Sequence, residues 1–210
     1  MRTDDLIDAL ARQGRPPEPS VGRVLRVAQA FGFAASAMLF MAILGPRADG
    51  VDALFRGWYG LKLVLVGGLA AAAFPVAEAL ARPGARPPAV GLMVVAAALV
   101  LAAAVDIALL GADGAASRLL GRNGLHCMSL VPLLAAAPFA AALIALRRGA
   151  PTRPGLAGAA AGLLSGALGA LLYGVFCPDD SPLFVAFWYT LAIGLVTALG
   201  VLAGRLFLRW

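Results

Sequence analysis

Residues 155–176 read GLAGAAAGLLSGALGALLYGVF, a run that contains no charged residue. At about 1.5 Å per residue, a helix of this length crosses the roughly 30 Å hydrocarbon core of a bilayer. Small residues recur at every fourth position of the run, at Gly158, Gly162, Gly166, Ala170 and Gly174. In lipid, such a face lets helix backbones approach closely. The stretch therefore predicts a transmembrane helix at the packed centre of a bundle.

The rest of the chain has the same character. Of its 210 residues, 61% are hydrophobic and 13% are charged, whereas soluble domains are about half apolar and a quarter charged. Apolar runs cover residues 24–44, 58–80, 89–110, 127–146, 155–176 and 183–207. The 77 residues that remain are too scattered for a domain of ordinary size. The sequence predicts an all-α, polytopic membrane bundle of six transmembrane helices.

The basic residues predict the orientation of this bundle. Lys62 lies inside the second run, and the sixteen arginines divide twelve to four between the two sides. The richer side holds Arg2, Arg12, Arg15, Arg23, Arg26, Arg82, Arg86, Arg147, Arg148, Arg153, Arg205 and Arg209. Short cytoplasmic loops carry such an excess, so we expect both termini in the cytoplasm of a bacterium and the spans in its inner membrane. The net charge of +6 is assigned to this bias and not to direct nucleic-acid binding.

Residues 1–23 precede the first span and predict a short, cytoplasmic, amphipathic helix. Its first turn carries Asp4 and Asp5, and its apolar face carries Leu6, Ile7 and Leu10. A helix this short is marginal alone in water, so we expect the apolar face to bind a partner and the two acids to face basic residues. The alternative is a helix that lies on the membrane surface, which the acidic first turn disfavours because the cytoplasmic leaflet is anionic.

The two cysteines fall on the other side of the membrane. Cys127 opens the fourth run and Cys177 follows the fifth. These two spans form a hairpin, so their extracytoplasmic ends can be neighbours, in a compartment where a disulfide is chemically permitted. Four interpretations stay open at this point: buried small side chains, a static disulfide, a reversible thiol pair, or a soft-metal site.

The soft-metal interpretation has few additional ligands to draw on. Two thiolates suit soft transition metals, and His126 beside Cys127, with Asp179 or Asp180 near Cys177, could complete the set. A transient soft metal ion is therefore the only ligand that the sequence suggests, and no resident cofactor is expected.

Two ionisable residues lie inside the predicted spans. Lys62 and Asp106 have opposite charge and similar depth, in spans that are adjacent along the chain. An ionisable group in a membrane is costly unless it is paired or hydrated. The sequence therefore predicts an intramembrane ion pair between Lys62 and Asp106.

Catalytic motifs are missing from the sequence. It has one His and two Cys, with no phosphate-binding GxxxxGK[ST] loop, no HExxH and no CxxC. An enzyme is therefore not expected. A small multi-pass transporter or channel for a metal or small ion is the alternative from another class. Pro75, Pro132 and Pro138 interrupt two spans, although no inverted repeat is visible.

Three stretches resemble the NrsF family of six-span membrane anti-sigma factors. They are MRTDDLIDALA (residues 1–11), PTRPGLAGAAAGLLSGALGALLY (residues 151–173) and CPDDSPLFVAFWY (residues 177–189). The resemblance implies an inner-membrane protein that holds an extracytoplasmic-function sigma factor inactive. It also implies that Cys127 and Cys177 sense heavy-metal or oxidative stress. One departure is Phe176, where the family commonly has His. This weakens the metal-coordination interpretation and leaves thiol chemistry or a different set of ligands.

Overall fold

The computed structural model describes residues 3, 8, 20–55 and 57–208. The five residues expected to bind a partner, Asp4, Asp5, Leu6, Ile7 and Leu10, lie outside the described residues. Their role stays a prediction.

All regular structure in the described residues is helical, and no strand occurs among them. The elements are α2 (Val21–Ile43), α3 (Gly50–Leu54), α4 (Tyr59–Leu80), α5 (Val90–Leu110), α6 (Ala115–Leu120), α7 (Gly124–Leu146), α8 (Pro154–Phe176), α9 (Pro182–Phe184), the π-helix η1 (Val185–Tyr189) and α10 (Thr190–Phe207). Six helical stretches are long and apolar enough to cross a membrane, with α6–α7 and α9–α10 each counted as one stretch. The predicted all-α, six-span fold is confirmed.

The helix boundaries differ slightly from the expected ones. Helix α2 begins at Val21 and α7 begins at Gly124, each three residues before the expected start, so α2 takes in the end of the expected amino-terminal segment. The short helices α3 and α6 and the π-helix η1 were not expected. Helices α3 and α6 lie in connections that have no long apolar run, and η1 lies directly after such a connection and α9.

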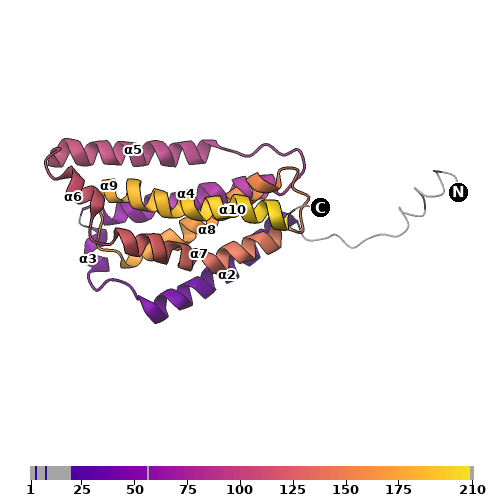
Figure 1. Cartoon of the computed structure of the whole chain (residues 1–210), viewed down its shortest axis with the longest axis horizontal. Coiled ribbons are helices and arrows are strands. Elements are labelled where there is room, and N and C mark those ends of the chain that lie inside the picture. The colour runs from indigo at the N-terminus through magenta and orange to yellow at the C-terminus, as the bar shows by residue number, and fades with distance from the viewer. Residues whose placement is uncertain (1–2, 4–7, 9–19, 56, 209–210) are drawn as a thin grey trace.

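The long helices run side by side, so the bundle has two ends (Figure 1). We call the end with Cys127 and Cys177 the cysteine end. There the chain also forms α3, α6 and α9 (Figure 1). We call the opposite end, where α2 begins and α10 finishes, the tail end.

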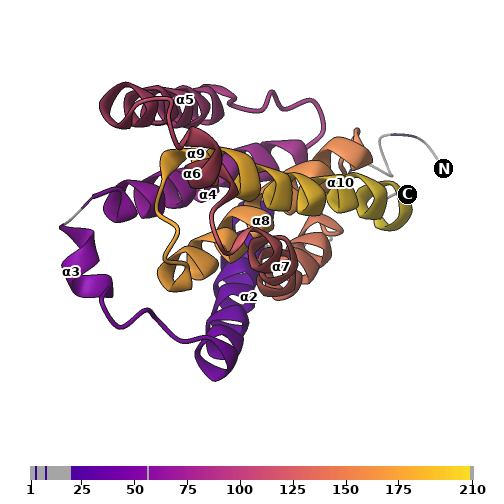
Figure 2. The same cartoon turned by 60° about the vertical axis from the view of Figure 1, so that its left-hand side comes forward.

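Helix α8 occupies the middle of the bundle, with α2, α4, α7 and α10 around it, while α5 lies at the edge (Figure 2). About two-thirds of the residues in the most apolar stretch of α8 are buried, whereas only about a tenth of those in α5 are. The expectation that residues 155–176 form the packed central helix therefore agrees with the structure.

Glycine explains the close contact of α8 with α10. A Cβ added to Gly158 would collide with the carbonyl oxygen of Gly200, and one added to Gly204 would collide with that of Pro154. Larger side chains would push the two backbones apart. The small-residue face of α8 thus does what such faces do in lipid, where helices associate through close van der Waals packing.

A proline organises the contact of α2 with α7. Pro138 has no N–H, so the carbonyl of Leu134 lacks its usual helical donor. The Ser36 hydroxyl donates to that carbonyl at 2.6 Å, and the Gln29 amide donates to the carbonyl of Pro138 at 2.9 Å. Gly32 lies directly against the Pro138 backbone. Polar side chains of α2 therefore join it to the broken backbone ladder of α7.

Candidate functional site

The two thiols lie at the cysteine end in one buried cluster. Cys127 is in the first turn of α7, and Cys177 directly follows α8. Both side chains are completely buried and both are free thiols. They share an apolar cluster with the rings of Tyr173 and Tyr189. The predicted placement of both cysteines at one end of the bundle agrees with the structure.

The structure does not gather the metal ligands that the sequence suggested. His126 is exposed, whereas its neighbour Cys127 is buried. Successive residues of a helix point about 100° apart, so the imidazole faces away from the thiols. In the described part of the chain, no three His, Cys, Asp or Glu side chains are arranged to hold a metal ion.

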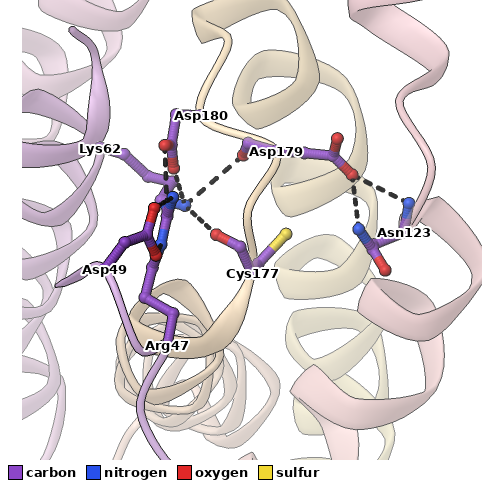
Figure 3. Close-up of polar contacts among 7 residues, drawn as sticks. All are labelled: Arg47, Asp49, Lys62, Asn123, Cys177, Asp179 and Asp180. Carbon is purple, nitrogen blue, oxygen red and sulfur yellow. Dashed lines mark hydrogen bonds and ion pairs between the residues drawn. The ribbon is translucent and has the colours of Figure 1, made fainter. Parts of the chain in front are cut away.

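Asp180, in the loop between α8 and α9, is paired with two cations. Its Oδ1 accepts a hydrogen bond from Lys62 Nζ at 2.6 Å, and its Oδ2 accepts one from Arg47 Nη1 at 2.8 Å (Figure 3). Lys62 Nζ also donates to the backbone carbonyl of Cys177 at 2.8 Å (Figure 3). Lys62 is only 1% exposed, so its charge depends on this carboxylate and these carbonyls.

The expected ion pair between Lys62 and Asp106 is therefore wrong. Asp106 is completely buried and accepts a hydrogen bond at 2.9 Å from Arg118 Nε, in α6. Arg118 also donates to the Gly111 carbonyl at the end of α5. Similar depth did not make Lys62 and Asp106 partners because the connections fold back over the helix ends and supply nearer countercharges.

Asp179 binds the beginning of α7. Its Oδ2 accepts hydrogen bonds from the Asn123 backbone N–H at 2.9 Å and from the Asn123 side-chain amide at 3.0 Å (Figure 3). It also accepts one from the backbone N–H of Arg122 at 3.1 Å. The first N–H groups of a helix lack partners within it and attract negative charge. In addition, the Tyr173 hydroxyl donates to the Asn123 carbonyl at 3.2 Å. The loop after Cys177 is thereby joined to the turn that precedes Cys127.

Arg47 connects the loop to α2 and α3. It binds both carboxylate oxygens of Asp49, at 2.7 and 2.8 Å, and its backbone N–H donates to the Val175 carbonyl at 3.3 Å. Hydrogen bonds to Asp49 and Asp180 raise the pKa of Arg47, and the hydrogen bond from Arg47 lowers the pKa of Asp49. Arg47 and Lys62 also lie over the Tyr59 ring, at 4.9 and 5.1 Å from its centre.

We refer to Arg47, Lys62, Asn123, Asp179 and Asp180 as the loop clasp. Together these residues hold residues 177–181 against α4, the connection between α2 and α3, and the turn before α7. Any displacement of Cys177 must therefore change contacts to three other helices or their connections.

Burial determines the resting chemistry of Cys177. Loss of solvation raises the pKa of its thiol, an effect that the nearby Lys62 charge opposes only in part. The thiolate is the form that attacks oxidants and binds metals. In this structure Cys177 is therefore a buried thiol that reacts more slowly than an exposed one.

Sequence reasoning missed most of the loop clasp. The sequence patterns suggest Asp179 and Asp180 only as metal ligands, and they do not single out Arg47 or Asn123 as site residues. One signal was present: a pair of acids follows Cys177 on the side of the membrane that has few basic residues, among them Arg47. Opposite charges confined to one end of a bundle are candidates for pairing.

Comparisons with known proteins place the chain among regulators of transcription. The profile of a family described as "NrsF: Negative regulator of sigma F" matches residues 10–210. The anti-sigma-F factor NrsF of Caulobacter vibrioides is 38% identical over 214 residues, which cover all of both chains. The probable anti-sigma-F factor NrsF of Azospira oryzae is 36% identical over 217 residues, again covering all of both chains. No solved structure matches the chain significantly.

Proposed function

The chain belongs to the NrsF family of negative regulators of sigma F, and from this premise we propose that it is a membrane anti-sigma factor that sequesters an extracytoplasmic-function sigma factor. It holds its sigma factor inactive through residues 1–23 and releases it when Cys127 and Cys177 are modified. A member of this family is a regulatory protein and not an enzyme. The family assignment also favours this function over that of a small transporter or channel.

The proposed location is the bacterial inner membrane, with both termini in the cytoplasm. Six apolar helical stretches support a position in a bilayer. The arginine bias of twelve to four supports the orientation. The tail end then faces the cytoplasm, where a sigma factor acts, and the cysteine end faces the outside, where stress first arrives.

Residues 1–23 are the proposed contact with the sigma factor. Leu6, Ile7 and Leu10 would occupy an apolar groove of the partner, with Asp4 and Asp5 facing basic residues. Burying an apolar side chain of this size contributes about 1.5–3 kcal/mol. Three such side chains together can offset the conformational entropy that the short segment loses when it binds, and so allow specific binding.

One observation supports the sensing proposal above all others: Lys62, in the first turn of α4, holds the carbonyl of Cys177 and the carboxylate of Asp180 at the same time. Oxidation of the two thiols, or their joint binding of a soft metal, would change the positions of the helix ends that carry them. The Cys177 carbonyl would then move away from Lys62. A buried cation that loses a partner is strongly destabilised, so α4 must respond.

Helix α4 also reaches the start of α2. Its Glu78 lies near the tail end and pairs with Arg82. Gly22, in the first turn of α2, packs so closely on the Glu78 carboxylate that an added Cβ would collide with it. Residues 1–23 enter α2 at this point. A rigid shift of α4 thus links the clasp to the segment that binds the sigma factor, because packed helices switch between discrete arrangements.

The proposed binding segment can be tested by replacing both Leu6 and Leu10 with Asp. We expect the variant to insert into the membrane normally and to lose the sigma factor in co-purification. Arg12→Asp is the matched control, because Arg12 lies on the far side of the predicted helix, and it should retain the partner. If the double variant recovers as much sigma factor as the unmodified chain, residues 1–23 are not the main contact.

A further inference from the structure

An apolar groove opens between α2 and α7 at the tail end of the bundle. It has a volume of about 370 Å³ and is lined by Val24, Val27, Ala28, Ile144 and Ala145, with Arg23 and Arg148 also lining it. Val27 is 51% exposed and Ile144 is 66% exposed. Both side chains belong to membrane-spanning helices, so their exposed surface is covered either by lipid or by a docked segment.

The charges at the groove are of one sign. In the described part of the chain, neither Arg23 nor Arg148 has a carboxylate within salt-bridge distance, although other arginines do. An occupant that fits the groove therefore has an apolar face and acidic groups beside it. These are the properties of the predicted helix at the amino terminus, where Asp4, Asp5 and Asp8 accompany Leu6, Ile7 and Leu10.

The same segment can reach the groove. Helix α2 begins at Val21, so Arg23 and Val24, which line the groove, are in its first turn. Six residues, 15–20, separate residues 3–14, which carry the predicted helix, from α2. At up to about 3.3 Å per residue they span roughly 20 Å, enough for a return to the first turn of α2. A short covalent tether gives an effective concentration near the millimolar range.

We propose that residues 3–14 of this chain dock in the groove between α2 and α7. Leu6, Ile7 and Leu10 lie on its apolar floor, and the acids of the segment pair with Arg23 and Arg148. This inference rests on the proposed function, because the face that docks is the face that binds the sigma factor. The docked state is therefore the state in which the sigma factor is free.

The position of the groove connects it with the thiols. One of its walls is the tail end of α7, and Cys127 lies in the first turn of the same helix at the other end. Helices α2 and α7 meet at Gly32 and Pro138, where α7 is interrupted. A change at Cys127 that alters the path of α7 therefore alters the width of the groove.

The test uses the full chain in vesicles of neutral phosphatidylcholine without any sigma factor. A photoreactive benzoylphenylalanine replaces Leu10, and the cross-linked residues are identified by mass spectrometry. We expect cross-links to Val24, Val27 or Ile144 of the same chain. Arg148→Glu should lower the yield about fivefold, which corresponds to about 1 kcal/mol. Asp4→Arg combined with Asp5→Arg should restore the yield in that background. Arg86→Glu is the matched control and should leave the yield unchanged.

Three results would overturn the docking proposal. They are cross-links mainly to lipid, cross-links mainly to a second copy of the chain, or a yield that Arg148→Glu does not change. Added sigma factor should reduce the cross-link by competition. An unchanged yield with bound sigma factor would contradict the claim that the same apolar face binds both the groove and the sigma factor. Because the first measurement contains no sigma factor, its failure leaves the anti-sigma function intact.

Discussion

Asp180 is paired with two cations at the cysteine end. It joins Lys62 of α4 to Arg47 of the α2–α3 connection, and it does so three residues after Cys177. Lys62 is almost completely buried, so it cannot exchange this carboxylate for water. The stability of the closed site therefore depends on one ion-pair geometry.

We predict that Asp180→Asn lowers the stability of the detergent-solubilised protein by about 2 kcal/mol, because it leaves a buried cation with fewer countercharges. A fall in the thermal midpoint measures this change. Lys62→Met should recover part of the loss in the double variant, since the two residues act on each other. Asp52→Asn, at an exposed position of α3, should leave the midpoint unchanged. Equal losses in Asp180→Asn and Asp52→Asn would contradict the role of the clasp.

We predict slow alkylation of Cys177 by a maleimide at neutral pH in the folded protein. Burial raises the pKa of this thiol above its ordinary value, and the thiolate is the reactive form. The rate should therefore rise with pH over a range above that of an ordinary thiol. It should also increase at constant pH in Asp180→Asn, which opens the clasp. Rapid labelling of the unmodified chain at pH 7 would show that the thiol is accessible in the resting state.

At the scale of the elements, α8 determines how closely the bundle packs. Its glycines contact the α10 backbone without any intervening side chain. We predict that Gly158→Ile destabilises the protein by about 3 kcal/mol or more, because the added side chain must separate the two helices. Gly194→Ile is the matched control, since a Cβ at Gly194 meets no atom within 4 Å. The folded yields after size-exclusion chromatography in detergent provide the comparison. Similar yields for both variants would contradict the packing described for α8.

Sequence patterns predicted the spans better than the site. Each span is a local property, because about twenty apolar residues must form a helix in lipid, and the small face of α8 is visible in residues 155–176 alone. The loop clasp depends on where connections fold after the helices pack. Depth in the membrane suggested Asp106 as the partner of Lys62, whereas the 177–181 loop supplies the partner that forms. The π-helix before α10 leaves no comparable sequence signal.

At the scale of the whole molecule, the structure has two polar ends and an apolar middle. The cysteine end contains the loop clasp, and the tail end contains Arg23, Arg148 and the beginning of α2. Helices α4 and α7 connect the two ends. Each begins at the loop clasp, through Lys62 for α4 and Asn123 for α7. Each also contacts α2, at Glu78 in α4 and at Pro138 in α7. This geometry suits a protein that reports an event on one side of a membrane to the other.

The orientation can be checked with reporter fusions. We predict that a reporter active only in the periplasm is silent when it is fused after Trp210, because the arginine bias places that end in the cytoplasm. The same reporter inserted after Gly114, in the connection between α5 and α6, should be active. The reverse pattern would place the cysteines in the cytoplasm and remove the basis for sensing external stress.

The most direct test of the central claim is release of the sigma factor from the full chain in vesicles after thiol modification. We predict that a thiol oxidant or a soft metal ion releases bound sigma factor from the unmodified chain. Cys127→Ser and Cys177→Ser should both bind the sigma factor normally and no longer release it, whereas the exposed control Ser129→Ala should release it as the unmodified chain does. Full release from both cysteine variants would contradict the account and place the sensor elsewhere in the molecule.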